Sequence, residues 1–269
     1  MSTYRNKLFA DYNSNHIIMV HPSMYENKSY YKDLMRIYVR LHNIFKENNI
    51  KQTIVLNNMQ DSNFYSTDNQ QDIQKLNYEC DDIWIRDYYP KFYAKGKNKI
   101  MISYDFNAYG KKYAYQKDKK FKEIFNYTIS DIDFGNIALE GGNLEFSSEG
   151  VVITNINSIK QNNHGIREEY IKNKLDEFKD KIGIAELYML DVDEICGDDT
   201  NGHIDNLVRF LNDDTIVYFA SKDKNYCNYE IACKLEKQIN IIIKKSKIIN
   251  KIIPIFHTNR DTFIKNKKI

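Results

Sequence analysis

Short runs of β-branched and other apolar residues alternate along this chain with longer amphipathic stretches. Runs of this length are typical of buried strands, and apolar residues recurring every three to four positions are typical of helices. The pattern predicts strands at 16–20, 53–57, 100–106, 150–155, 186–191, 214–220 and 251–256, and helices at 29–48, 167–181 and 226–244. No linker rich in Pro, Gly or Ser divides the chain. We therefore expect one α/β domain spanning residues 1–269.

Charge and composition exclude several classes of partner. The net charge is +2 and no long run of Lys or Arg occurs, so a nucleic-acid partner is not expected. The polar N-terminus and the lack of an apolar run near 20 residues predict neither a signal peptide nor a membrane span. We expect a cytoplasmic protein with reduced thiols. A homo-oligomer is compatible with the sequence.

The four cysteines show no paired metal-ligand spacing: Cys80, Cys196, Cys227 and Cys233.

The segment CGDDTNGHIDNLVRF, residues 196–210, places a histidine two positions before an aspartate. On an extended strand His203 and Asp205 would point to the same face. A histidine beside a carboxylate indicates proton transfer on a cationic substrate, although the same spacing occurs in metal sites. The other histidines are scattered singly, so we favour chemistry without a metal.

The segment DDIWIRDYYP, residues 81–90, contains the only tryptophan. One interpretation places Trp84 as the wall of a pocket in which Asp87 binds a cation. The alternative is a strand end at which Arg86 and Asp87 form a surface ion pair, worth about 0–1 kcal/mol.

Two further segments have less specific signals. LEGGN, residues 139–143, is either a solvated turn or a loop in which Glu140 points inward and the bare backbone of Gly141 and Gly142 approaches a ligand. FNAYGKKYAYQKD, residues 106–118, combines aromatic residues and lysines. By itself this segment is interpreted as a solvated face that carries ordinary tyrosines.

Taken together, WIRD, FNAYGKKY, LEGGN and GDDTNGHIDN, in this order, resemble the agmatine deiminase and bacterial-type peptidylarginine deiminase family. The resemblance extends from about His16 to about Pro254. It implies the pentein fold, a five-bladed α/β propeller of ββαβ-type modules with a central site. It also implies that neither a metal nor an organic cofactor is used.

The resemblance further implies roles for the motif residues. Asp87 and Asp205 would bind the planar guanidinium of the substrate, and Trp84 would lie along its stem. His203 would protonate the departing ammonia and then activate water. The implied reaction converts agmatine and water to N-carbamoylputrescine and ammonia, a step of putrescine biosynthesis. A peptidylarginine deiminase is the alternative within the family.

The family's nucleophile is a cysteine in a C-terminal GGGxIHC-like segment, and these 269 residues contain no such segment. We therefore expect a propeller that is incomplete at its C-terminal module, with little deiminase activity. Cys196, seven residues before His203, is the nearest substitute. The alternatives are an inactive guanidinium-binding homologue, a truncated gene product, or a metal-dependent hydrolase that uses His203 and Asp205.

Overall fold

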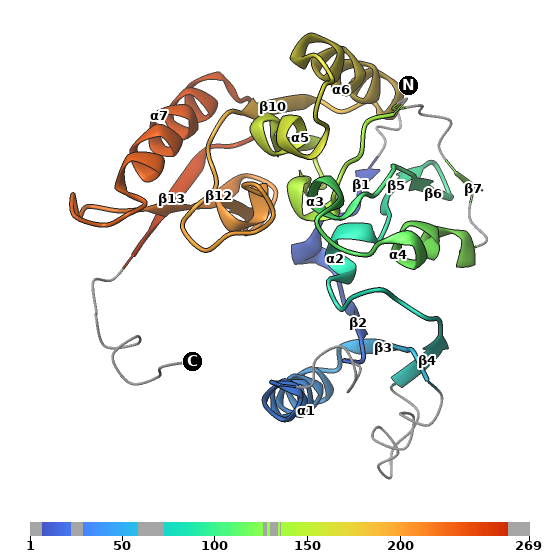
Figure 1. Ribbon diagram of the computed structural model, residues 1–269. Coiled ribbons are helices and arrows are strands. Elements are labelled where there is room, and N and C mark those ends of the chain that lie inside the picture. The colour runs from blue at the N-terminus through green and yellow to red at the C-terminus, as the bar shows by residue number, and fades with distance from the viewer. Residues whose placement is uncertain are drawn as a thin grey trace. The chain divides into compact units, whose positions relative to one another are not determined.

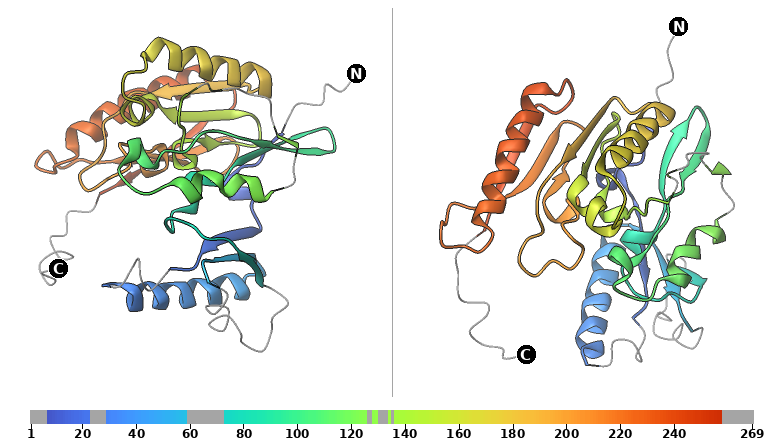
Figure 2. Two further views of the ribbon diagram at one scale, coloured as in Figure 1. Left: turned by 45° about the vertical axis from the view of Figure 1, so that its right-hand side comes forward. Right: turned by 45° about the horizontal axis from the view of Figure 1, so that its top comes forward.

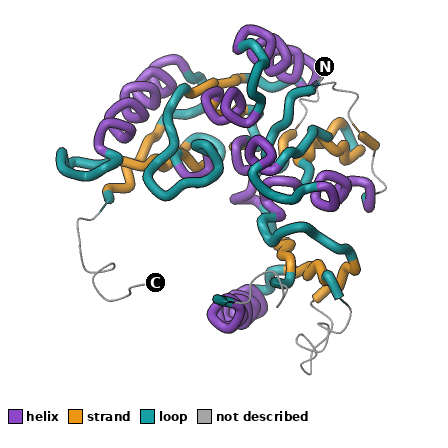
Figure 3. Tube along the Cα trace, viewed as in Figure 1, coloured by secondary structure: helices purple, strands orange, loops and turns teal. Residues whose placement is uncertain are grey.

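The computed structural model describes residues 7–22, 29–58, 73–125, 128–129, 134 and 136–257. Contacts within the chain divide it into two compact units. Unit 1 comprises residues 1–141 and 162–165, and unit 2 comprises residues 142–161 and 166–269. Both units contain helices and strands (Figure 1; Figure 3).

Unit 1 begins with a parallel sheet of β2 (His16–Val20), β3 (Lys51–Leu56) and β4 (Ile73–Asn77). Helix α1 (Tyr31–Glu47) connects β2 to β3 and packs against β3 (Figure 2). The middle strand β3 is buried from its second residue onward. A parallel pair joined by a helix is the arrangement that such buried apolar runs favour.

The second sheet of unit 1 has the order β1-β5-β6-β7. Strands β5 and β6 form an antiparallel hairpin, and β7 pairs parallel to β6 after a helical connection. Its elements are β1 (Lys7–Leu8), β5 (Lys91–Lys95), β6 (Asn98–Ile102), β7 (Thr128–Ile129), α2 (Ile85–Tyr88), α3 (Ala108–Lys111) and α4 (Gln116–Lys120), with 3-10 turns at Asp11–Asn13 and Phe121–Ile124.

Unit 2 contains two three-stranded sheets of the same design. In each, an antiparallel pair is followed by a helical connection to a parallel strand. The first contains β8 (Glu145–Phe146), β9 (Val151–Asn155), α5 (Ile156–Asn162), α6 (Glu168–Ile182) and β10 (Glu186–Leu190). The second contains β11 (Val208–Phe210), β12 (Thr215–Ala220), α7 (Tyr229–Lys245) and β13 (Lys251–Phe256). The ββαβ-type module therefore recurs in both units.

The long helices end where their sequences provide end signals. Helix α6 has Glu168 and Glu169 in its first turn, where the helix dipole favours acids. It stops at Gly183, whose φ of 74° is left-handed and free of strain only for glycine. Helix α7 packs against β12 through an apolar stripe of Ala232, Leu235, Ile239 and Ile242.

Most of the strands and helices predicted from periodicity are confirmed to within a few residues. The strand predicted at 100–106 is wrong beyond Ile102. There the chain leaves the sheet. Asp105 pairs with Ala138 as an isolated bridge, and its backbone carbonyl accepts a hydrogen bond from the Leu139 N–H at 2.8 Å. The backbone of this stretch therefore supports the LEGGN segment instead of extending β6. The elements not predicted are the strands β1, β4, β5, β7, β8 and β11 and the helices α2, α3, α4 and α5.

Candidate active site

The WIRD segment forms a single helical turn rather than the end of a strand. The Asp87 N–H donates to the Trp84 carbonyl at 3.0 Å, and the Tyr89 N–H donates to the Ile85 carbonyl at 2.8 Å. Tyr89 is already extended, with ψ of 128°, because the following Pro90 disfavours the helical conformation of its predecessor.

The side chains of this turn differ in exposure. Asp87 is 6% exposed, so the alternative of a surface ion pair at a strand end is wrong. Trp84 is 62% exposed, and its role as a pocket wall stays a prediction. Arg86 forms an ion pair with Asp11. The turn thus directs a carboxylate into the core of unit 1 and leaves the indole accessible.

The residue that contacts Asp87 comes from the FNAYG segment. The Tyr109 hydroxyl donates to Asp87 Oδ2 at 2.7 Å. Tyr109 is 3% exposed, so the interpretation of this segment as a solvated face is wrong at this position. Burial, and then the charge of Asp87, raises the pKa of the Tyr109 phenol. The phenol therefore remains a donor.

Glu140 of LEGGN is also buried, at 1% exposure, so the alternative of a solvated turn is wrong. Its Oε2 accepts a hydrogen bond from Asn162 Nδ2 at 2.8 Å. Asn162 in turn accepts through its carbonyl from Asn107 Nδ2 at 2.8 Å. Because Asn107 and Tyr109 belong to one turn, the same segment supports Glu140 through Asn162 and contacts Asp87 directly.

Gly141 follows Glu140 at a point of close backbone approach. A Cβ at this position would lie 2.2 Å from the Arg86 carbonyl oxygen and 2.9 Å from the Tyr104 hydroxyl. Only glycine fits between these groups. This contact brings the LEGGN backbone against the WIRD turn.

His203 and Asp205 lie at a 3-10 turn, not on a strand. His203 is the extended residue that precedes the turn Ile204–Asn206, and Asp205 lies inside it. The prediction that both side chains share one face of a strand is therefore wrong. The reason is local: Thr200 Oγ1 accepts from the His203 N–H at 3.1 Å, and Asn143 Oδ1 accepts from the Ile204 N–H at 3.2 Å. Neither N–H is available to a strand partner.

Two buried asparagines support this turn, and neither is among the residues predicted from the sequence. Asn143 Nδ2 donates to the Asn155 carbonyl at 3.0 Å, and Asn143 Oδ1 accepts from the Asn155 N–H at 3.1 Å. Asn155 Nδ2 also donates to the carbonyls of Gly202 and Val192 at 2.6 and 2.8 Å. The end of β9 is thereby linked to the residue before His203. The polar Asn155 after four β-branched or apolar positions was the available signal.

His203 is 1% exposed, whereas Asp205 is half-buried. The structure thus places Asp87 and Glu140, both buried, in unit 1, and His203 and Asp205 in unit 2.

The cysteines differ in their surroundings. Cys80 is buried, and burial raises the pKa of its thiol to about 12. Cys196 and Cys227 are exposed, and a hydrogen bond with the Cys196 thiol raises the pKa of Cys227. Since the thiolate is the nucleophilic form, Cys80 and Cys227 are poorly suited to attack a carbon at neutral pH. Cys196 as a nucleophile stays a prediction.

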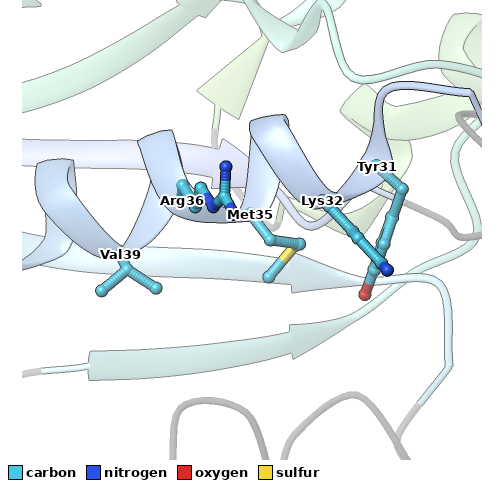
Figure 4. Close-up of a pocket in the computed structure, with 5 residues that line it drawn as sticks. All are labelled: Tyr31, Lys32, Met35, Arg36 and Val39. Carbon is cyan, nitrogen blue, oxygen red and sulfur yellow. The ribbon is translucent and has the colours of Figure 1, made fainter.

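A hollow of about 530 Å³ lies along one face of α1 (Figure 4), lined by Tyr31, Lys32, Met35, Arg36 and Val39. Its two charged residues are basic, so it does not suit a guanidinium, and it contains no residue of the four motifs.

Within the described residues, no three His, Cys, Asp or Glu side chains group as a metal site would require. No helix in the described ranges is long and apolar enough to cross a membrane.

Residues 11–266 match the family described as Porphyromonas-type peptidyl-arginine deiminase. The chain belongs to this family. A relative from Selenomonas ruminantium is 29% identical over 173 residues, which are 61% of this chain and 46% of that protein. An agmatine deiminase from Pseudomonas putida is 26% identical over 170 residues, 60% of this chain and 45% of that enzyme. The chain spans about half the length of the curated relatives it matches.

Solved structures of the family share this fold. The agmatine deiminase of C. jejuni with substrate bound has a TM-score of 0.77 at 21% identity, covering 93% of this chain and 74% of that one. The agmatine deiminase of Enterococcus faecalis has a TM-score of 0.74 at 18% identity, covering 95% and 72%. The α/β fold implied by the resemblance is confirmed.

Proposed function

We propose that this protein is a guanidino-group deiminase of the agmatine deiminase type. The observation that carries the proposal is the pair of buried carboxylates in unit 1, Asp87 and Glu140, each of which accepts a hydrogen bond from a neighbouring side chain. Carboxylates held in place by hydrogen bonds suit a cationic ligand, because a guanidinium presents N–H donors that match carboxylate oxygens. A small cationic substrate such as agmatine is such a ligand. The recurring ββαβ-type modules support a pentein propeller as the complete fold.

In this proposal Asp87 and Asp205 bind the guanidinium, whose fork of N–H donors matches carboxylate oxygens. Trp84 contacts the substrate through the face of its exposed ring, which attracts cations. Glu140, Gly141 and Gly142 complete the substrate-binding loop. His203 is the proton donor to the departing ammonia and then the base that activates water.

The covalent step requires a cysteine thiolate, which adds to the guanidinium carbon while ammonia leaves, and water then hydrolyses the thiouronium to a ureido group. The GGGxIHC-like segment of the family is absent from these 269 residues. We therefore propose that residues 1–269 by themselves bind agmatine and convert it only very slowly. A guanidinium-binding protein without turnover is the second candidate, because Asp87 and Asp205 can bind a guanidinium without the cysteine.

Ammonia release from agmatine by the purified chain tests the proposal, with wild type, His203→Ala and Cys196→Ser compared. Slow release that falls in His203→Ala and persists in Cys196→Ser supports it. Robust release abolished by Cys196→Ser identifies Cys196 as the nucleophile. Binding without release favours the second candidate. Release from a peptidyl-arginine but not from agmatine favours the peptidylarginine deiminase alternative, and loss with a chelator favours the metal-dependent hydrolase.

A further inference from the structure

The FNAYG segment adopts a backbone that most residues avoid. Four consecutive residues have positive φ: Ala108 at 49°, Tyr109 at 58°, Gly110 at 83° and Lys111 at 69°. Only one of them is glycine, although each other residue is disfavoured in this region. Such strain persists when surrounding contacts over-determine it, and it concentrates at functional sites.

Asn107 closes this left-handed turn from its own side chain and backbone. Its Oδ1 accepts from the Gly110 N–H at 2.9 Å, and its carbonyl accepts from the Lys111 N–H at 2.7 Å. The turn is therefore held locally, and it projects the side chain of Tyr109 into the core.

The core then fixes the ring of Tyr109. The ring packs edge-to-face on Phe106, with centroids 6.2 Å apart and planes at 86°. The same cluster of buried residues contains Ile85 and Tyr88 of the WIRD turn. Because the ring and the WIRD turn belong to one packed cluster, the hydroxyl is held at 2.7 Å from Asp87 Oδ2.

We propose that Tyr109 is a positioning residue that fixes the Asp87 carboxylate, through a hydrogen bond imposed by the left-handed turn, for binding the guanidinium. This inference rests on the proposed function. The bond determines the orientation of the carboxylate and stabilises its ionised form, because a donor favours the charged acceptor. A purely structural tyrosine would instead contribute only its ring, which phenylalanine retains.

Tyr109→Phe removes the hydroxyl and keeps the ring. We expect agmatine, titrated into the chain by calorimetry, to bind about ten- to a hundredfold more weakly, as for loss of a hydrogen bond to a charged group. The pH below which binding is lost should also rise in this variant. In an Asp87→Asn background the same substitution should have no further effect, since Tyr109 acts through Asp87. Tyr218→Phe, which removes a 3.1 Å hydrogen bond to Glu236, is the matched control and should bind agmatine as wild type does.

A second readout needs no ligand. The carboxyl carbon of Asp87, identified in NMR spectra by its loss in Asp87→Asn, should titrate at higher pH in Tyr109→Phe than in wild type. An unchanged titration and unchanged binding overturn the positioning role. If Asp87→Asn itself leaves agmatine binding unchanged, the proposed function fails instead, and the carboxyl titration still decides whether Tyr109 acts on Asp87.

Discussion

Three buried acids in unit 1 accept hydrogen bonds from different kinds of donor. Asp87 accepts from a phenol and Glu140 from an amide. Asp118 is fully buried and accepts from the Asp81 N–H at 2.8 Å. Burial, and then the charge of Asp82, raises the pKa of Asp118 to about 8. Asp118 is therefore a protonated acid in the folded protein at neutral pH.

This assignment predicts a pH-dependent stability. The pKa of Asp118 in the folded state lies above the value near 3.9 of an unfolded chain. Its neutral form thus stabilises the fold fully below about pH 4, and this contribution is lost as the pH rises through 8. Asp118→Asn cannot ionise. We expect the variant to be more stable than wild type at pH 9, by up to a few kcal/mol, with no advantage near pH 4.

Denaturant unfolding across this pH range measures the difference. Asp180→Asn, on the exposed face of α6, is the matched control and should follow wild type. A constant difference between Asp118→Asn and wild type from pH 4 to pH 9 would contradict the assignment.

Gly141 gives a steric prediction. In Gly141→Ala the added methyl meets the Arg86 carbonyl and the Tyr104 hydroxyl, and the LEGGN backbone must move away from the WIRD turn. We expect a loss of about 1–3 kcal/mol in the free energy of unfolding, as for overpacking elsewhere, together with weaker agmatine binding. Gly96→Ala, at φ of 62° with open space around it, should cost stability through its backbone alone. Agmatine binding that is reduced equally in both variants would refute the specific role of Gly141.

At this scale the motifs of the sequence singled out Asp87, Glu140 and His203, and all three are buried in the structure. The sequence did not identify Tyr109 or Asn155. Their contribution depends on partners 22 and 47 residues away in the chain, Asp87 and Gly202. Long-range hydrogen bonds of this kind leave no periodic signal.

At the scale of elements, the long helices and central strands were predictable, because burial imposes a period on their sequences. Single turns were not. The WIRD helix is four residues long, shorter than any detectable period, and it is set by Pro90 and by packing. Strand β8, with two residues, is likewise too short to show a period. The site is built largely from these short elements, so its geometry was less predictable than the fold.

Asn155, the last residue of β9, provides the test at this scale. Asn155→Ala leaves the buried backbone groups of Val192 and Gly202 without its side-chain hydrogen bonds. We expect a loss of about 2–4 kcal/mol in the free energy of unfolding, since several buried groups lose partners. Asn157→Ala loses an exposed bond to Asp193 and a 3.3 Å bond to the Val192 carbonyl, which keeps its 2.8 Å bond from Asn155. It should cost less than about 1 kcal/mol. Chemical denaturation of both variants measures the free energy of unfolding. Equal losses would contradict the expectation that the Asn155 hydrogen bonds stabilise the fold more than those of Asn157.

At the scale of the whole molecule, the same ββαβ-type module forms sheets in both units. In unit 1 the motif segments 81–90 and 106–109 flank the hairpin of β5 and β6, and in unit 2 the motif at 197–206 joins β10 to β11. Motif residues therefore lie on connections between strands, whereas the strands supply the buried framework. This separation lets the framework persist at low sequence identity, as the similarity to solved deiminases at 18–21% identity shows.

The central claim is that this chain recognises a guanidinium through its carboxylates. Calorimetric titration with agmatine and with putrescine, which carries an amine in place of the guanidino group, tests it most directly. We expect agmatine to bind more tightly than putrescine, and Asp87→Asn and Asp205→Asn each to weaken agmatine binding about ten- to a hundredfold. Equal affinity for the two ligands, or agmatine binding that is unchanged in both variants, would contradict the account.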